Sequence, residues 1–176
     1  MQLNMSKERF ATYLRNFVFG VEDSLVSTVG LVSGVAIAGA SKSAIFLTGM
    51  VLIFVEAFSM GVGSFLSEQS SEGYMKQGEP ALKLSVSAAV IMFVSYFISG
   101  FIPLAPYIAL EEPRTAFGWS IAASLAALLI LGMCGARLSK LPMWRGGLKM
   151  MLVGGFAIAL GVLVGAVLNS FGFSVV

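Results

Sequence analysis

Five apolar stretches, each long enough to cross a lipid bilayer, occupy most of this chain of 176 residues. They cover approximately residues 17–40, 44–66, 84–103, 117–136 and 148–171. A membrane-spanning helix needs about 20 mainly apolar residues. Charged residues make up only 11% of the chain, against about a quarter in a typical soluble domain. The sequence therefore predicts an all-α integral membrane protein with five transmembrane helices, forming a single domain over residues 1–176. Pro103 and Pro106 are expected to end the third span.

The basic residues predict the orientation of these spans. If the loops alternate between the two sides, one side receives nine of the eleven Lys and Arg residues and the other receives only Lys42 and Arg114. Cytoplasmic loops of membrane proteins carry this excess of positive charge. We expect a cytoplasmic N-terminus, a C-terminus on the far side, and a short cytoplasmic acidic loop over residues 67–83. Because the basic residues are divided among loops at the membrane boundary, no nucleic acid partner is expected.

The first span carries an acidic residue on a stripe of small and polar residues. At 100° per residue, several residues fall within about 60° of Asp23 around the helix, namely Asn16, Gly20, Ser27, Gly30 and Gly34. A charge at the centre of a membrane helix costs roughly 2.5–3.5 kcal/mol, so an acid retained there is a functional candidate. The alternative is a helix-packing seam that contains one buried acid, because Gly30 and Gly34 have the spacing of closely packed membrane helices. Glu22 lies about 100° from Asp23 and is a secondary candidate.

The second span repeats this construction around Glu56. Residues within about 40° of Glu56 on the helix are Gly49, Leu52, Met60, Gly63 and Ser67. With 1.5 Å per residue, Asp23 and Met60 both lie roughly 6–8 Å to the cytosolic side of the bilayer midplane, with Glu56 one turn deeper. Two carboxylates supply oxygen ligands, and a thioether favours transition metals over magnesium or calcium. The sequence therefore predicts a metal site made of Asp23, Glu56 and Met60.

The polar segments at the cytoplasmic side allow two interpretations each. Glu68, Glu72 and Glu79 could attract cations to an entrance, or they could form an ordinary solvated acidic loop. Residues 1–16 could form a helix lying along the membrane surface, or a disordered tail that carries positive charge.

Several classes of function lack the residues that they need. The chain has no histidine and a single cysteine, and it contains neither a phosphate-binding glycine loop nor a nucleophile elbow. We expect neither an enzyme nor a permanent cofactor.

Two motifs resemble those of a known family. Val21-Glu-Asp-Ser-Leu-Val-Ser-Thr-Val-Gly-Leu-Val-Ser-Gly-Val35 is similar to the first-helix pattern of the vacuolar iron transporter family, which includes the yeast calcium-cross-complementer and plant nodulin-like transporters. Ala57-Phe-Ser-Met-Gly-Val-Gly-Ser-Phe-Leu-Ser67 resembles the second-helix pattern. The chain departs from the family at Ser24, usually a glycine, and at Leu52, where the family often has the acid that stands here at Glu56. It also lacks the long cytosolic metal-binding domain that many members carry between the second and third spans.

This resemblance implies a homodimer whose first and second helices line a path at the two-fold interface, in which Asp23 and Met60 hold the ion. It also implies export of Fe²⁺ or Mn²⁺ from the cytosol by proton antiport. Two alternatives remain open: a membrane scaffold that does not transport, and a passive cation channel. The chain has no recognisable targeting segment, so a prokaryotic plasma membrane is the simplest location, with an organelle such as the vacuole as the alternative.

Overall fold

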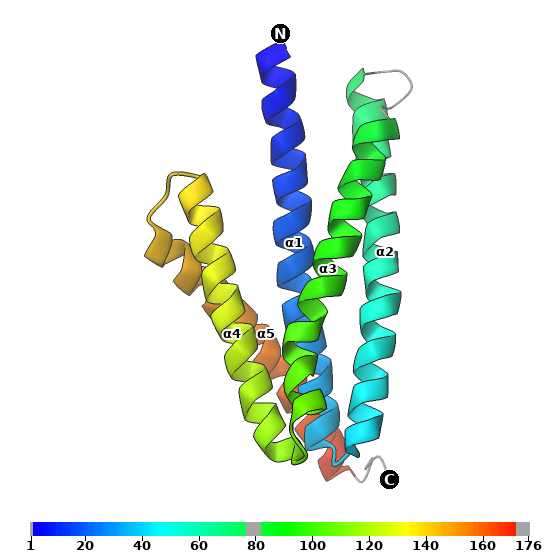
Figure 1. Ribbon diagram of the computed structural model, residues 1–176, viewed down its shortest axis with the longest axis vertical. Coiled ribbons are helices and arrows are strands. Elements are labelled where there is room, and N and C mark those ends of the chain that lie inside the picture. Colours follow the sequence, from blue (N-terminus) through cyan, green and yellow to red (C-terminus); the bar gives the residue numbers. More distant parts are fainter. Residues whose placement is uncertain (1, 77–81, 172–176) are drawn as a thin grey trace.

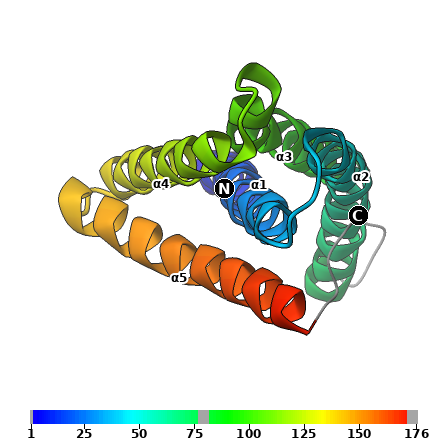
Figure 2. The same ribbon diagram turned by 90° about the horizontal axis from the view of Figure 1, so that it is seen from below.

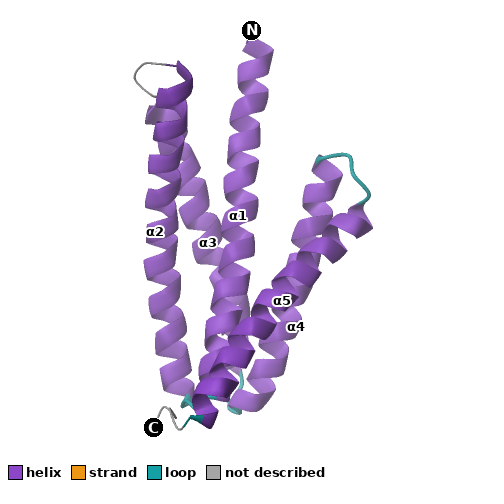
Figure 3. Ribbon diagram, turned by 180° about the vertical axis from the view of Figure 1, so that it is seen from behind, coloured by secondary structure: helices purple, strands orange, loops and turns teal. Residues whose placement is uncertain are grey.

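The computed structural model describes residues 2–76 and 82–171, and this part of the chain is almost entirely helical (Figures 1 and 3). The helices are α1 (Gln2–Ile37), α2 (Lys42–Lys76), α3 (Leu82–Ala109), α4 (Pro113–Leu138) and α5 (Met143–Ser170). All five are long and apolar enough to cross a membrane, and the described residues contain no strand. The chain is an all-α membrane protein with five candidate spans, which confirms the predicted fold class.

α1 stands at the centre of the bundle and contacts each of the other four helices. The hairpin of α2 and α3 packs on one side of it and the hairpin of α4 and α5 on the other (Figures 1 and 2). The beginning of α1 and the end of α5 lie at opposite ends of the bundle (Figure 1). This arrangement agrees with an odd number of spans.

Two apolar clusters join α1 to these hairpins. One contains Val32, Ile53 and Leu104 and so connects α1 with α2 and α3. The other contains Leu25 and Leu128, together with residues of α5, and connects α1 with α4 and α5. Burial of apolar side chains on two opposite sides leaves little of α1 facing the lipid.

Glycines bring α1 and α5 into backbone contact. A Cβ atom added at Gly165 would lie 2.4 Å from the carbonyl oxygen of Gly34, and one added at Gly161 would lie 2.9 Å from Cα of Gly30. Membrane helices approach closely where small residues recur at this four-residue spacing. Gly30 and Gly34, whose spacing suggested close packing, therefore meet Gly161 and Gly165.

The bounds of α1 and α2 differ from the sequence-based expectations. α1 begins at Gln2 and runs without a break into the first span, so residues 2–16 form neither a separate surface helix nor a tail. α2 continues to Lys76, so most of the expected loop over residues 67–83 is helical. No proline occurs between residues 42 and 76, and the helix can therefore extend beyond the apolar segment.

α3 continues through both of its prolines and ends at Ala109, so the expectation that they end the helix was wrong. Pro103 is buried, and its carbonyl oxygen accepts a hydrogen bond of 2.7 Å from Ser120 Oγ of α4. Membrane helices tolerate proline where neighbouring helices and serine side chains bind the backbone polar groups. The prolines themselves remove the N–H donors that would bond the carbonyls of Ser99 and Ile102, and the Ser120 bond is an additional contact of this segment with α4.

Candidate functional site

Asp23 of α1 and Glu56 of α2 lie within range of an electrostatic interaction with each other. Both side chains are half-buried. The two predicted spans that carry these acids, residues 17–40 and 44–66, include no Lys or Arg. Two neighbouring carboxylates in a medium of low dielectric repel each other unless a cation or a proton lies between them. The arrangement therefore favours binding of a cation or a proton.

Met60 is the predicted sulfur ligand on α2. It follows Glu56 by one helical turn and is half-buried. It is therefore nearer than Glu56 to the end of the bundle at which α1 begins. Among the residues from 2 to 76 and 82 to 171, no three Asp, Glu, Cys or His side chains come together as a potential metal site. Within one chain, the metal site predicted at Asp23, Glu56 and Met60 therefore stays a prediction.

α3 contributes a tyrosine that the sequence pattern did not single out. Tyr96 is fully buried, its hydroxyl lies 2.7 Å from Ser27 Oγ, and it interacts electrostatically with both Asp23 and Glu56. Ser24 Oγ donates a hydrogen bond of 2.6 Å to the backbone carbonyl of Tyr96. α3 therefore reaches the surroundings of the candidate site through this residue.

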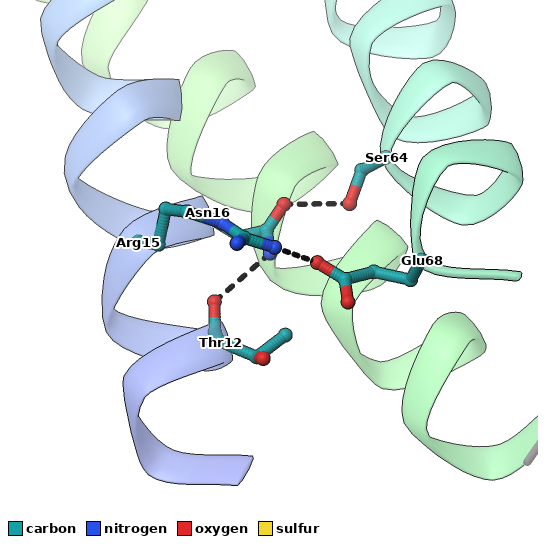
Figure 4. A network of polar contacts seen from close by, with 5 residues as sticks. All are labelled: Thr12, Arg15, Asn16, Ser64 and Glu68. Atoms are coloured by element: carbon teal, nitrogen blue, oxygen red, sulfur yellow. Dashed lines mark hydrogen bonds and ion pairs between the residues drawn. The ribbon is translucent and has the colours of Figure 1, made fainter. Parts of the chain in front are cut away.

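A polar network connects α1 and α2 about two helical turns from the acids, toward the beginning of α1 (Figure 4). Arg15 forms an ion pair with Glu68. Ser64 Oγ donates to Asn16 Oδ1 at 2.6 Å, and Asn16 Nδ2 donates to the carbonyl of Thr12 at 2.9 Å. Glu68 is only 6% exposed. The entrance role predicted for Glu68 stays a prediction, but its carboxylate already has a basic partner on α1.

We expect this network to stabilise the α1–α2 contact by a small, measurable amount. In a double-mutant cycle with Asn16→Ala and Ser64→Ala, the coupling free energy should be about 0.6 kcal/mol and at most about 1.7 kcal/mol, the range seen for hydrogen bonds between membrane helices. The measurement is reversible unfolding in mixed detergent micelles.

Ser70→Ala is the matched control for this cycle, because the Ser70 hydroxyl donates to the carbonyl of Leu66 in its own helix. Its coupling with Asn16→Ala should be close to zero. Equal coupling for the two serines would contradict the assigned contact.

The remaining predicted residues have different positions. Glu72 is half-buried near the end of α2, and Glu79 lies outside the described residues. Ser67 and Gly63 are exposed on α2, and a Cβ atom at Gly63 would meet no atom within 4 Å. These two residues therefore do not contribute to packing within one chain.

Ser27, Gly30 and Gly34 line an apolar groove of about 690 Å³ between α1 and α5. Its opposite wall is formed by α5, including Gly161 and Gly165. Ser27 thus lines this groove and also contacts the hydroxyl of Tyr96. Gly30 and Gly34 of the predicted first-span stripe pack on α5, whereas Gly20 lies against Met92 and Ser95 of α3.

Comparison with known proteins agrees with this architecture. A sequence model described as "VIT family" matches residues 14–83 and 76–166. Vacuolar iron transporter homolog 3 of Arabidopsis thaliana is 30% identical over 160 residues, which cover 85% of this chain and 80% of the relative. Vacuolar iron transporter homolog 5 of Oryza sativa subsp. japonica is 30% identical over 166 residues, which cover 88% and 79% respectively. The match includes all five helices, and the chain belongs to the VIT family.

Proposed function

We propose that this protein exports Fe²⁺ or Mn²⁺ from the cytosol in exchange for protons, through a path at a homodimer interface. The observation that carries the proposal is the pair of carboxylates, Asp23 and Glu56, which lie within electrostatic reach of each other inside a membrane bundle. Ionisable residues within membrane spans mark ion pathways and proton relays. The relatives named vacuolar iron transporter homologs support iron as a substrate.

The ligand types favour a transition metal. Two carboxylates neutralise the charge of a divalent ion, and the sulfur of Met60 is a softer donor than Mg²⁺ or Ca²⁺ prefers. Fe²⁺ and Mn²⁺ accept such mixed ligand sets. We therefore expect discrimination against Mg²⁺ and Ca²⁺ at this site.

A second copy of the chain would complete the site. One chain supplies two carboxylates and one thioether, and a two-fold partner would double this number. The face of α2 that carries Gly63 and Ser67 is exposed in the single chain, as expected of a surface that meets a partner. Homodimers with two-fold symmetry are the commonest oligomers.

Exchange of metal for protons follows from competition for the same oxygens. A carboxylate that holds a divalent ion must be ionised, and protonation releases the ion. If metal enters at the end of the bundle rich in basic residues and leaves at the other, protons move in the opposite direction. Export by this route fits either a prokaryotic plasma membrane or a vacuolar membrane.

Ion flux into proteoliposomes tests this proposal. We expect uptake of Fe²⁺ and Mn²⁺, accelerated severalfold when the lumen is acidic, together with a rise in lumenal pH as metal enters. Uptake of Mg²⁺ and Ca²⁺ should be much slower. Flux that ignores the pH gradient would indicate a passive channel instead, and no flux of any ion through folded protein would indicate a scaffold.

A further inference from the structure

We propose that one end of the hairpin formed by α4 and α5 binds the headgroups of anionic phospholipids. This end, the α4–α5 tip, comprises the last turn of α4, the connection and the first turns of α5, residues 135–149. The inference goes beyond the proposed function, because the tip contains none of the predicted metal ligands and lipid can bind there without a metal ion.

The α4–α5 tip carries positive charge and no acid. No Asp or Glu follows Glu112 in the sequence. Four basic residues of the tip are exposed, and none of them forms an ion pair with another residue that the structure describes, namely Arg137, Lys140, Arg145 and Lys149. Arg145 and Lys149 stand one turn apart on α5, a spacing at which like charges repel each other. A bound anion would remove this repulsion.

The length of α4 places the tip at the membrane boundary. α4 has 26 residues, which is about 39 Å and exceeds the hydrocarbon core of about 30 Å by only about 9 Å. Arg137 directly follows the apolar segment 117–136, and Lys149 lies at the start of the segment 148–171. α1 and α2 are longer, and Figure 1 shows that they continue well beyond the tip. The basic residues of the tip therefore lie at the depth of lipid phosphates.

Exposed apolar side chains lie between these basic residues in the sequence. Leu138, Leu141 and Trp144 are 56%, 62% and 65% exposed. Tryptophan is enriched where lipid meets water, because its ring is apolar and its N–H is polar. A phospholipid offers a phosphate and acyl chains side by side, so it satisfies both kinds of side chain. This mixture favours a lipid over a partner in the water beyond the membrane.

Lys140 has a backbone conformation that lysine does not favour. Its φ is 57°, in the left-handed region where a Cβ atom causes strain. The turn after Ser139 is closed by the N–H of Lys140 on the carbonyl of Arg137 at 3.1 Å, and by the N–H of Leu141 on the carbonyl of Ala136 at 2.9 Å. Glycine is usual at this position of such a turn. A lysine that is kept there at a cost in stability indicates a use for its amino group.

Backbone contact between the two helices fixes the tip. A Cβ atom added at Gly132 of α4 would lie 2.6 Å from the carbonyl oxygen of Gly146 and 2.9 Å from Cα of Gly147, both on α5. The turn between the helices is held by the hydrogen bonds just described. Charges on a rigid support bind a ligand with a smaller loss of entropy than charges on a flexible loop. The tip is therefore suited to hold a headgroup.

The test uses the two tryptophans of the chain, which lie near opposite ends of α4 and α5. In Trp119→Phe, only Trp144 of the tip remains. This protein is reconstituted in phosphatidylcholine vesicles in which either phosphatidylcholine or phosphatidylglycerol carries bromine, which quenches the fluorescence of a nearby tryptophan. We expect phosphatidylglycerol to be enriched at least about fivefold beside Trp144, because one basic residue near an anionic membrane surface contributes roughly that factor.

Substitutions in the tip separate lipid binding from folding. In the Trp119→Phe background, the triple variant Arg137→Gln, Lys140→Gln, Arg145→Gln should lose the preference for phosphatidylglycerol. Lys140→Gly alone should weaken it about fivefold and at the same time raise the temperature of unfolding in detergent, because glycine relieves the backbone strain. A lysine with only a structural role would not produce these two opposite effects.

Lys83→Gln is the matched control for charge. Lys83 is an exposed basic residue at the beginning of α3, at the same end of the bundle, and its loss should leave the quenching of Trp144 unchanged.

Trp144→Phe is the matched control for position, because only Trp119 then reports. The connections at that end of the bundle and the helix ends beside them carry two basic and two acidic residues, namely Lys42, Glu111, Glu112 and Arg114. We expect no preference for the anionic lipid there.

Four results would overturn the inference. They are equal quenching of Trp144 by the two brominated lipids, an unchanged preference in the triple variant, the same preference at Trp119, and relief of quenching by inorganic phosphate at constant ionic strength. The last result would indicate a site for free phosphate. None of these measurements involves a metal, so their outcome is independent of whether the protein transports one.

Discussion

Neutralising either acid of the candidate site, by Asp23→Asn or Glu56→Gln, should reduce metal uptake by about 100-fold or more. Even the outer-shell partners of metal ligands contribute about 10–100-fold to affinity or activity, and these two residues are proposed to contact the ion directly. Each substitution keeps the shape of the side chain and removes one negative charge. Uptake of Fe²⁺ and Mn²⁺ into proteoliposomes measures the effect.

Glu111→Gln is the control for these variants. Glu111 is an exposed acid between α3 and α4, with Lys42 at 3.5 Å as its partner. Exposed ion pairs contribute little to stability, so uptake should stay close to the wild-type value. Normal uptake in both Asp23→Asn and Glu56→Gln would refute the proposed site.

The largest effect on stability is expected at the contact between α1 and α5. A Cβ atom at Gly165 would lie 2.4 Å from the carbonyl oxygen and 2.6 Å from Cα of Gly34. These are backbone atoms, so Gly165→Ala cannot be accommodated by rotation of a side chain and must push the helices apart. Overpacking of this kind costs typically about 1–3 kcal/mol. We expect a clear decrease in the temperature of unfolding in detergent.

Gly135→Ala provides the comparison within α4. A Cβ atom at Gly135 would meet no atom within 4 Å, and alanine favours a helix by about 0.8–1.0 kcal/mol over glycine. Its unfolding temperature should therefore be unchanged or slightly higher. Equal unfolding temperatures for the two variants would show that α1 and α5 are not in close contact at Gly165.

The sequence was sufficient to predict the number and order of the spans, because the bilayer imposes a length on every helix that crosses it. It was less informative about where the helices end. Lipid thickness limits the apolar part of a helix but not its extension into water, so α2 could continue past Ser67 and α1 could begin at Gln2. Pro103 was misjudged for a related reason, since it is buried against another helix, α4, and the preference of proline for helix ends does not take such packing into account.

Helical periodicity predicted that Asp23 and Glu56 would each lie on a polar face, and the two acids lie within electrostatic range of each other, although their role as metal ligands stays a prediction. Periodicity gives the angular position of each residue around its own helix, and it contains no information on which residues of another helix lie opposite. The contact of Tyr96 with Ser27 and the ion pair of Arg15 with Glu68 depend on how two helices are aligned along each other. A tyrosine in an apolar span is also typical of ordinary packing, and only its two neighbouring serines, Ser95 and Ser99, could have drawn attention to it.

The central position of α1 has a consequence for biogenesis. α1 leaves the ribosome before the other four helices, yet its polar groups depend on helices made later. Ser24 and Ser27 find their partner, Tyr96, only when α3 has been synthesised, and Gly30 and Gly34 are covered only by the end of α5. We therefore expect α1 to remain beside the insertion machinery, or to be inserted in the lipid without a stable position, until the rest of the chain has been synthesised.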